Sequence, residues 1–383
     1  MGVEFRLGRQ DGHKVEDFLA REPAGVSAIT LSARYMRHQA AAAEAAMALD
    51  ADVLFDPATE RLIAPGFELD AMPYWHGVPM DVDRLKRDAG ARTVLIAEVL
   101  DAHPDVATLV TPPHFYVDSD GAAELNIALA EETAQRGDRD TRPVLLASRA
   151  YAAKHSVALA SAYLAAGIER LELRLTPVGG DDESVRKLQS VFATCHAFTA
   201  VGIELTLGLS GNVGHAAVAR GHAAHYSVGV GLCEQVDYKA ALSRQIAPPK
   251  PADESKPRFG AIAGIYLPGP MLLVGRKVGA ALLADTDIRT KIGCRLGGCG
   301  TSINGPANDP RDHYLHARAH EVSATLAQPV AWRANLEQER LRRAVELRSL
   351  INDHYLPDGQ HPLKTRTLKS LLDARTDGQA QTA

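Results

Sequence analysis

The stretch Pro143–Leu175, PVLLASRAYAAKHSVALASAYLAAGIERLELRL, contains the unit from which the fold can be inferred. The runs Pro143–Arg149 and Arg170–Leu175 are short and mostly apolar, which is typical of buried strands. Between them, Lys154–Ala166 is rich in alanine and has the apolar spacing of an amphipathic helix. A strand, a helix and a second strand in this order predict a βαβ unit with parallel strands.

The same alternation continues on both sides of this unit. Six further candidate strands are Ser27–Arg34, Asp52–Asp56, Ala107–His114, Glu204–Ser210, His225–Gly231 and Gly260–Leu267. Further helical patterns cover His38–Leu49, Glu124–Arg136 and Asp182–Val201. About eight β/α units within about 280 residues predict a closed (β/α)8 barrel of the TIM type. In such a barrel, functional side chains lie at the carboxyl ends of the strands and in the loops that follow.

Length and composition bound the rest of the architecture. The chain has 383 residues, of which 46% are hydrophobic, and this is enough for one large core. We expect an N-terminal segment over 1–25, the barrel over 26–293, and a C-terminal helical, candidate zinc-binding subdomain over 294–383. The clearest helical pattern of that subdomain is Asn335–Asn352. The proline-rich segment Ile246–Arg258 predicts a long loop before the last expected strand.

Charge and targeting signals limit the functional classes. The net charge of −5 argues against a broadly basic nucleic-acid binder, yet Lys239–Arg295 holds ten basic residues against four acidic ones. Such a segment either binds phosphates or is a solvated loop rich in lysine and proline. The chain has four cysteines, no run of about 18 apolar residues, and no apolar signal core at its charged N-terminus. These features predict a reduced, cytoplasmic protein without membrane contact.

Polar side chains occur where the predicted strands end. A charged residue in or just beyond a strand buried on both faces is costly unless it is paired or used. Alternatively, such a residue faces the helices, and an arginine stem covers apolar surface while its charged end reaches water. Our candidates for ligand contact are Arg34, Asp56, His114, Arg149, Arg174, Ser210, Asn212 and Glu234.

Two glycine-rich segments also follow predicted strands. The turn Gly208–Gly214 opens a predicted helix, whose free backbone amides attract a phosphate or another anion, unless it is an ordinary tight βα turn. The segment Tyr226–Glu234, YSVGVGLCE, ends in small residues and a carboxylate. The backbone at Gly229 and Gly231, together with Glu234, suits the edge of a flat heterocycle, although glycine also permits close helix packing.

Cys294 and Cys299 precede a predicted helix that carries several histidines. His316 and His320 are spaced i, i+4 on that helix, so two thiolates and two imidazoles can form a tetrahedral, structural zinc site. Alternatively, the cysteines are buried thiols, and His313, His316 and His320 form a polar helix face. The sequence indicates no organic cofactor.

Several of these segments, in this order, resemble the tRNA-guanine transglycosylase superfamily, which includes relatives that insert 7-deazaguanines into DNA. YSVGVGLCE resembles the family's glycine-rich strand that ends in glutamate, and Leu282–Arg289 resembles its catalytic segment, in which an aspartate is followed by an arginine. The Tyr-Leu-His stretch that ends at His316, before Glu321, is similar to the family's zinc subdomain. The resemblance covers Tyr226–Asn352, about a third of the chain.

The chain departs from the family pattern at the zinc subdomain and before the last strand. The family's zinc turn has three cysteines where this chain has two, and Trp332 and Arg333 stand near the place of the family's ligand histidine. The proline-rich segment also distinguishes this chain from the compact tRNA enzymes. The resemblance implies that Glu234 and the backbone around Gly229–Gly231 bind the base.

The resemblance further implies base exchange on a nucleic acid, tRNA or DNA. An aspartate attacks the ribose anomeric carbon, a guanine leaves, and a purine or 7-deazapurine base takes its place. Asp287 or Asp285 would be the nucleophile, with Asp287 preferred because it is nearer to Arg289, and Asp56 is a candidate general acid or base. The target base must lie in a loop or be flipped out of its helix.

Two other functions compete with this hypothesis. One is an unrelated (β/α)8 enzyme for a small anionic metabolite, with Arg149, Arg174 and the Gly208–Gly214 turn as its anion site. The other is a non-catalytic barrel subunit of a nucleic-acid-processing complex, which docks through the arginine-rich helix Asn335–Asn352. The sequence leaves open whether the chain forms a homodimer or needs a partner protein.

Overall fold

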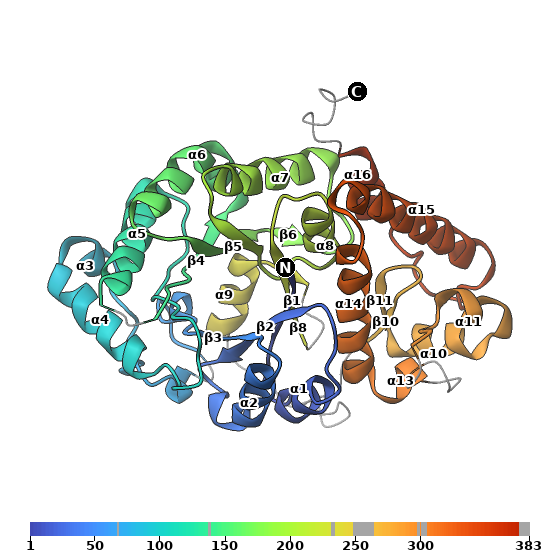
Figure 1. Cartoon of the computed structure of the whole chain (residues 1–383), viewed down its shortest axis with the longest axis horizontal. Helices are drawn as coiled ribbons and strands as arrows, with labels where there is room; N and C mark the ends of the chain where they lie inside the picture. The colour runs from blue at the N-terminus through green and yellow to red at the C-terminus, as the bar shows by residue number, and fades with distance from the viewer. Residues whose placement is uncertain are drawn as a thin grey trace.

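The computed structural model describes residues 1–66, 69–136, 139–230, 234–247, 264–296, 299 and 305–374. At its centre, seven parallel strands form one sheet in the order β3-β2-β1-β8-β7-β5-β4. The sheet curls into a half-barrel (Figure 1). Its strands are β1 (Gly2–Arg6), β2 (Val26–Ser32), β3 (Asp52–Asp56), β4 (Val144–Ser148), β5 (Arg170–Thr176), β7 (Glu204–Leu207) and β8 (His225–Gly229).

Helices cover the outer face of this sheet. They are α1 (Gly12–Leu19), α2 (Ala40–Ala48), α3 (Val82–Arg87), α4 (Ala89–Asp101), α5 (Asp120–Ala134), α6 (Arg149–Ala165), α7 (Val185–Ala200), α8 (Gly211–Ala219) and α14 (Pro310–Leu326). Alternate strand residues such as Val3, Phe5 and Leu173 are fully buried in the main core between the sheet and these helices. The outer face is therefore apolar, as expected for an α/β protein.

The sheet is not a closed barrel, so this part of the sequence prediction is wrong. The expected third strand, 107–114, contains two consecutive prolines, which lack the N–H that a ladder needs. It lies across the opening between β3 and β4, where the Thr108 amide donates to the Val53 carbonyl at 2.8 Å. On its other side, the Arg142 amide donates to the Val110 carbonyl, also at 2.8 Å. The segment thus spans the gap without becoming a regular strand.

The first strand of the sheet and the last expected strand also differ from the prediction. β1 comes from the segment expected to precede the barrel, yet it lies between β2 and β8 in the middle of the sheet. Its sequence, GVEFR, alternates charged and apolar residues and so lacks the continuous apolar run that marks a parallel strand. The expected eighth strand is instead β10 (Gly264–Leu267), which pairs antiparallel with β11 (Leu272–Gly275) outside the main sheet. Residues 260–263 lie outside the described residues.

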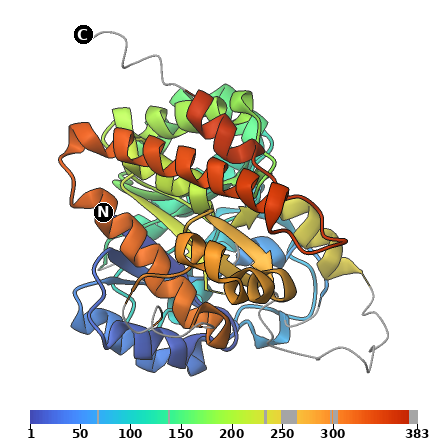
Figure 2. The same ribbon diagram turned by 90° about the vertical axis from the view of Figure 1, so that its right-hand side faces the viewer.

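The C-terminal elements lie on one side of the half-barrel (Figure 2). They are β10, β11, α10 (Arg276–Ala284), α11 (Thr286–Ile292), α13 (Gly305–Asn308), α15 (Val330–His354) and α16 (Arg366–Asp373). A second apolar core, with Ile265, Leu282, Ile288 and Ile351, joins the hairpin to α10, α11 and α15. The Asn335–Asn352 helical pattern lies within α15.

Short elements complete the loops. They are the 3-10 helices η1 (Met36–His38), η2 (Thr59–Arg61) and η3 (Leu69–Ala71), the helix α9 (Tyr238–Ile246), and the antiparallel pair β6 (Val178–Gly179) and β9 (Gln235–Val236). None of the helices in the described residues combines the length and the hydropathy that spanning a lipid bilayer requires.

Candidate functional site

The inner face of the half-barrel is filled by charged side chains. Successive strand residues point to opposite faces, so Glu4 on β1, Glu172 and Arg174 on β5, and Asp56 at the end of β3 face away from the helices. These four side chains belong to residues that are at most 4% exposed. Burying an ion costs several kcal/mol unless partners compensate for the lost water. A cluster of this kind at the carboxyl ends of strands is a functional-site candidate.

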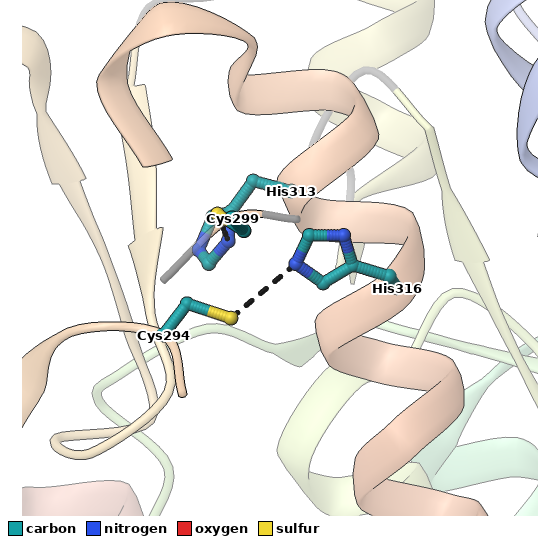
Figure 3. Close-up of side chains that lie close together, drawn as sticks. All are labelled: Cys294, Cys299, His313 and His316. Carbon is teal, nitrogen blue, oxygen red and sulfur yellow. Dashed lines mark hydrogen bonds between the residues drawn. The ribbon is translucent and has the colours of Figure 1, made fainter. Parts of the chain in front are cut away.

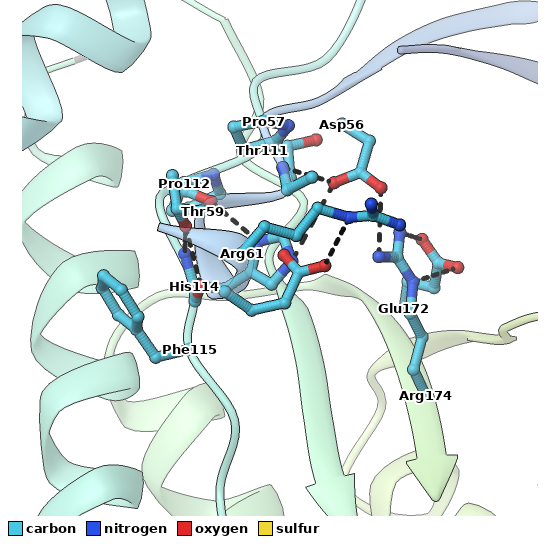
Figure 4. Close-up of polar contacts among 12 residues, drawn as sticks. Asp56, Pro57, Thr59, Arg61, Thr111, Pro112, His114, Phe115, Glu172 and Arg174 are labelled. Carbon is cyan, nitrogen blue, oxygen red and sulfur yellow. Dashed lines mark hydrogen bonds and ion pairs between the residues drawn. The ribbon is translucent and has the colours of Figure 1, made fainter. Parts of the chain in front are cut away.

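The carboxylate of Asp56 lies at the centre of this arrangement (Figure 4). Arg174 Nη1 donates to Asp56 Oδ2 at 3.1 Å, and Arg6 donates to the same oxygen. Glu172 holds Arg174 through two hydrogen bonds of 2.9 and 2.8 Å. Burial raises the pKa of Asp56, but the charges of Arg174 and Arg6 outweigh burial and hold that pKa well below its usual range. Asp56 is therefore ionised at neutral pH.

His114 lies between Asp56 and a second carboxylate, Glu60. Its Nε2 atom is 3.3 Å from Glu60 Oε2 and 3.9 Å from Asp56 Oδ1. The backbone of His114 is fixed by Thr59, whose hydroxyl accepts from the His114 amide and donates to its carbonyl, both at 2.7 Å. The imidazole thus lies within 4 Å of a carboxylate oxygen on each side. We call Arg6, Asp56, Glu60, His114, Glu172 and Arg174 the Asp56 cluster.

A second polar layer supports this cluster from within the half-barrel. Arg142 Nη2 donates to Glu4 Oε2 at 2.8 Å, and the Thr206 hydroxyl donates to Glu4 Oε1 at 2.8 Å. A cavity of about 10 Å³ remains against Asp56, Glu172 and the two layers of arginines, which is room for about one water molecule. The interior is therefore closely packed, by paired charges together with a few aliphatic side chains such as Leu54 and Val144.

We expect Glu172 to make the fold sensitive to acid. Burial raises the pKa of Glu172, but the charges of Arg174 and, to a smaller extent, Arg6 lower it by more. The net result is a pKa of about 2, compared with an ordinary value of 4.5. A lowered folded-state pKa contributes stability that is complete above about pH 5 and is lost as the pH falls toward the folded-state value. The shift corresponds to about 3 kcal/mol of unfolding free energy.

Urea unfolding between pH 3 and pH 7 checks this prediction. Glu172→Gln should flatten the decline of unfolding free energy below pH 5, because the glutamine does not titrate. It should also lower stability at pH 7, because Arg174 loses its bidentate partner. The matched control Glu346→Gln changes an exposed carboxylate on α15 and should keep the wild-type profile. A Glu172→Gln profile that parallels the wild type would show that this pair does not set the acid limit.

Glu234 lies in a second polar cluster next to α8. Its Oε1 atom accepts from Arg318 Nε at 2.8 Å and from the Tyr314 hydroxyl. Arg318 Nη1 also donates to Asn212 Oδ1 at 3.0 Å. A Cβ placed on Gly211 would lie 2.4 Å from Glu234 Oε2, so this carboxylate occupies the space at the start of α8. The Gly208–Gly214 turn thus faces a side-chain carboxylate at the position where we considered a bound anion.

A cavity of about 210 Å³ opens beside Glu234, with Ser210, Asn212 and Gln235 in its lining. This is smaller than the roughly 300–1,000 Å³ typical of sites for drug-sized ligands, and it suits a single heterocycle. The Gly208–Gly211 turn connects the two clusters, because a Cβ on Gly208 would lie 2.5 Å from Glu172 Oε1. The cavity beside Glu234 and the Asp56 cluster are therefore built on the same turn.

A third cluster joins Cys294, Cys299, His313 and His316 (Figure 3). One ligand atom from each of these residues lies within 4.8 Å of the others, so the group can hold a metal ion. Cys294 Sγ is 3.3 Å from His316 Nε2, and Cys299 Sγ is 3.3 Å from His313 Nδ1. His320, which we expected as a ligand, is exposed on α14 and is not a member. The histidines at i, i+3 face the cysteines, whereas the i+7 position lies on the same face but about 10 Å further along the helix axis, beyond their reach.

Outer contacts fix both imidazoles in the orientation that metal binding needs. His313 Nε2 is 2.6 Å from the Tyr266 carbonyl, and His316 Nδ1 is 3.8 Å from Asp312 Oδ2. Ligand histidines usually use their second nitrogen in this way. The hydrogen bond from Cys299 lowers the pKa of Cys294 to about 2, while the same contact raises the pKa of Cys299.

The remaining predicted residues do not join these clusters. Asp285 lies between α10 and α11, Asp287 is the second residue of α11, and both are exposed. Asp285 Oδ1 caps α11 by accepting from the Asp287 and Ile288 amides at 2.9 and 3.2 Å. Figure 1 shows α11 well apart from β3, which ends in Asp56. The structure therefore does not bring these aspartates to the carboxyl edge of the sheet.

Other candidates have mainly local surroundings. Arg149 is the first residue of α6, and Arg289 is half-buried in α11. Ser210 is buried, and its hydroxyl donates to the Leu207 carbonyl at 2.8 Å. Gly229 ends β8, whereas Gly231 lies outside the described residues.

Sequence reasoning missed several members of the clusters. Arg6 and Glu172 carry a usable signal, because charged residues repeat at every second position in GVEFR and LELRL. His313 was noted on the correct helix but was not chosen as a ligand. Glu60 and Arg318 had no local signal, because an isolated charged residue in a loop or helix is ordinarily solvated.

Together these features define a TIM-like α/β protein with a polar candidate active site at the carboxyl edge of a parallel half-barrel. No family model matches the sequence, and no curated protein matches it. The chemistry of the three clusters is accordingly the basis on which a function can be proposed.

Proposed function

We propose that this chain is a base-exchange transglycosylase, which replaces a guanine in tRNA or DNA with a 7-deazaguanine-type base. The observation that carries the proposal is the ionised carboxylate of Asp56, held at the sheet edge between Arg6 and Arg174. An ionised carboxylate is the form that attacks an anomeric carbon. Its burial also keeps it away from bulk water, which would otherwise hydrolyse the glycosyl ester. Substrate entry requires the loop after β3 to move, because the cluster is closed in this structure.

The proposed reaction proceeds in two displacements. Asp56 forms a bond to the ribose C1′ while the bond from C1′ to the guanine N9 breaks, and its electron pair stays on N9. His114 donates the proton that neutralises the departing guanine. The incoming base then returns a proton to His114, attacks C1′ and releases the Asp56 carboxylate. This assignment replaces the Asp285 and Asp287 nucleophiles that the resemblance implied.

The cavity beside Glu234 is the proposed binding site for the base. Ser210 and Asn212 supply polar groups at its wall, and Glu234 accepts hydrogen bonds from the N–H edge of a guanine-type ring. Arg318 and Tyr314 hold the Glu234 carboxylate in a fixed orientation. The shared Gly208–Gly211 turn relates this cavity to the Asp56 cluster, as base exchange requires.

We further propose that the Cys294, Cys299, His313 and His316 cluster binds a structural zinc ion. Two thiolates and two imidazoles are the donor set of closed, four-coordinate zinc sites. The ion would supply a covalent link between the segment after α11 and the start of α14. It takes no part in the proposed displacement.

Incorporation of radiolabelled guanine is the direct test of this function. Purified protein should transfer labelled guanine into either unmodified tRNA or DNA, in proportion to protein concentration, and excess unlabelled guanine should chase the label out. Omission of the polymer is the control for non-specific retention. Failure to label both polymers, with a correctly folded protein and over a range of salt concentrations, would contradict base exchange.

The hypothesis of a small-metabolite enzyme is less well supported. Arg174, which would be the main anion-binding residue of such an enzyme, already donates hydrogen bonds to Glu172 and Asp56. The start of α8, its second anion site, is occupied by Glu234. Both groups are thus already neutralised by carboxylates of the chain.

A further inference from the structure

A basic pocket borders the Asp56 cluster and shares one residue, Glu60, with it. This pocket has a volume of about 290 Å³, and its lining includes Arg34, Glu60, Arg61, Tyr238 and Arg244. These residues follow β2, β3 and β8, so the pocket lies on the carboxyl side of the sheet. We call it the arginine pocket.

Hydrogen bonds hold the walls of the arginine pocket together. Gln245 Nε2 on α9 donates to the Arg61 carbonyl at 2.8 Å and to the Ala64 carbonyl at 2.9 Å. The Tyr238 hydroxyl donates to the Glu60 carbonyl at 3.1 Å. The helix α9 is therefore fixed against the loop that follows Asp56, and a ligand would meet a preformed site.

The charge of the arginine pocket is unbalanced. The lining has three arginines from three separate segments and one acidic residue, Glu60, and Arg34 takes part in a further interaction of its own, which leaves Arg61 and Arg244 to face a ligand. Glu60 Oε2 already lies 3.3 Å from His114 Nε2, while Arg61 is 3.9 Å from Glu60 Oε1. Arg244 is exposed on α9 and pairs with no carboxylate of the described residues. Convergent arginines with a net positive charge favour a phosphate group, which they bind through paired N–H donors.

Glu60 connects this pocket to the proposed reaction. Glu60 lines the arginine pocket, and its Oε2 atom lies 3.3 Å from Nε2 of His114, which is 3.9 Å from Asp56 Oδ1. We propose that the arginine pocket binds a backbone phosphate of the nucleic-acid substrate, close to the nucleotide whose base is exchanged. This inference rests on the proposed function for the identity of the polymer. The phosphate fixes the strand so that its sugar is presented to Asp56.

Binding of a fluorescein-labelled 12-nucleotide single-stranded DNA, and of the RNA of the same sequence, tests the pocket without any exchange reaction. Arg244→Ala and Arg61→Ala should each weaken binding about five- to tenfold and reduce the salt slope of log K by about 1. Arg244→Lys should restore part of the loss. The control Arg342→Ala removes an exposed arginine from α15, with the same change in net charge, and should bind like the wild type. Thermal unfolding verifies that each variant is folded.

The outcomes separate the pocket from its alternatives. Equal effects of Arg244→Ala and Arg342→Ala would overturn the proposal, because net charge alone would then explain the binding. In another outcome, guanosine monophosphate, but not guanosine, competes with the oligonucleotide at micromolar concentration in the wild type and fails to do so in Arg244→Ala. That result would also overturn the proposal, because the pocket would then bind a free nucleotide. Arg244-dependent binding of the oligonucleotide by a protein that incorporates no guanine supports the pocket and contradicts only the transglycosylase.

Discussion

The Asp56→Asn variant should incorporate labelled guanine at least about 10⁴-fold more slowly than the wild type. Asparagine keeps the size of aspartate and still accepts hydrogen bonds from Arg6 and Arg174, but its amide does not displace a base from C1′. The effect is expected on the maximal rate, because the polymer and the base bind elsewhere. The measurement is the initial rate of incorporation at saturating substrate, with circular dichroism and thermal unfolding as checks on the fold.

Two matched variants make this result decisive. Asp285→Asn and Asp287→Asn change exposed aspartates of the C-terminal part and should keep the rate within about twofold of the wild type, as surface substitutions usually do. An inactive Asp287→Asn beside an active Asp56→Asn would reverse the assignment. The nucleophile would then be the one implied by the resemblance, and α11 would have to approach the sheet during catalysis. Trapping of a covalent polymer–protein adduct before denaturing electrophoresis gives an independent readout.

Loss of the metal should have the second largest effect. We expect one zinc ion per chain, and removal of a ligand in Cys294→Ser or His313→Ala should abolish stoichiometric binding. A site that is saturated a thousandfold above its dissociation constant contributes about 4 kcal/mol to stability. Without the metal, the second core around Ile265 and Ile288 should unfold first, because the cluster lies beside the hairpin and α11. Elemental analysis measures the metal, and urea unfolding with and without a chelator measures the stability.

His320→Ala is the control for this experiment. His320 lies on the same helix as His313 and His316 but is exposed, so its removal should leave both the zinc content and the unfolding profile unchanged. Retention of zinc by His313→Ala together with its loss from His320→Ala would overturn the proposed set of four ligands. If the wild type binds no zinc under reducing conditions, the zinc site is contradicted and the alternative, that the two cysteines are buried thiols, is supported.

Much of the fold follows from local patterns in the sequence. The run 143–175 correctly predicts β4, α6 and β5, because each is encoded by the spacing of neighbouring apolar residues. β1 was not predicted, because Glu4 and Arg6 alternate with its apolar residues and no continuous apolar run results. The hairpin β10–β11 was mistaken for a barrel strand, because a four-residue apolar run does not specify its partner or its direction.

The candidate site was predictable only in part. Asp56, His114 and Arg174 were singled out, because each follows or interrupts an apolar strand. Their mutual contacts were not predictable, since Asp56 and Arg174 are 118 positions apart and Glu4 and Arg142 are 138 apart. The choice between His313 and His320, which share one face of α14, likewise depends on where along the helix the cysteine segment packs, and the helical spacing does not specify this.

The sequence by itself determined that strands and helices alternate and that polar residues mark several strand ends, because both are properties of adjacent residues. Only the tertiary structure decided that the sheet stays open between β3 and β4, that inward-facing charges pair into one cluster, and that Asp285 caps a surface helix. These outcomes depend on strand register and helix rotation. Both are set by packing between segments that lie far apart in the chain, and burial then selects which charges must find a partner.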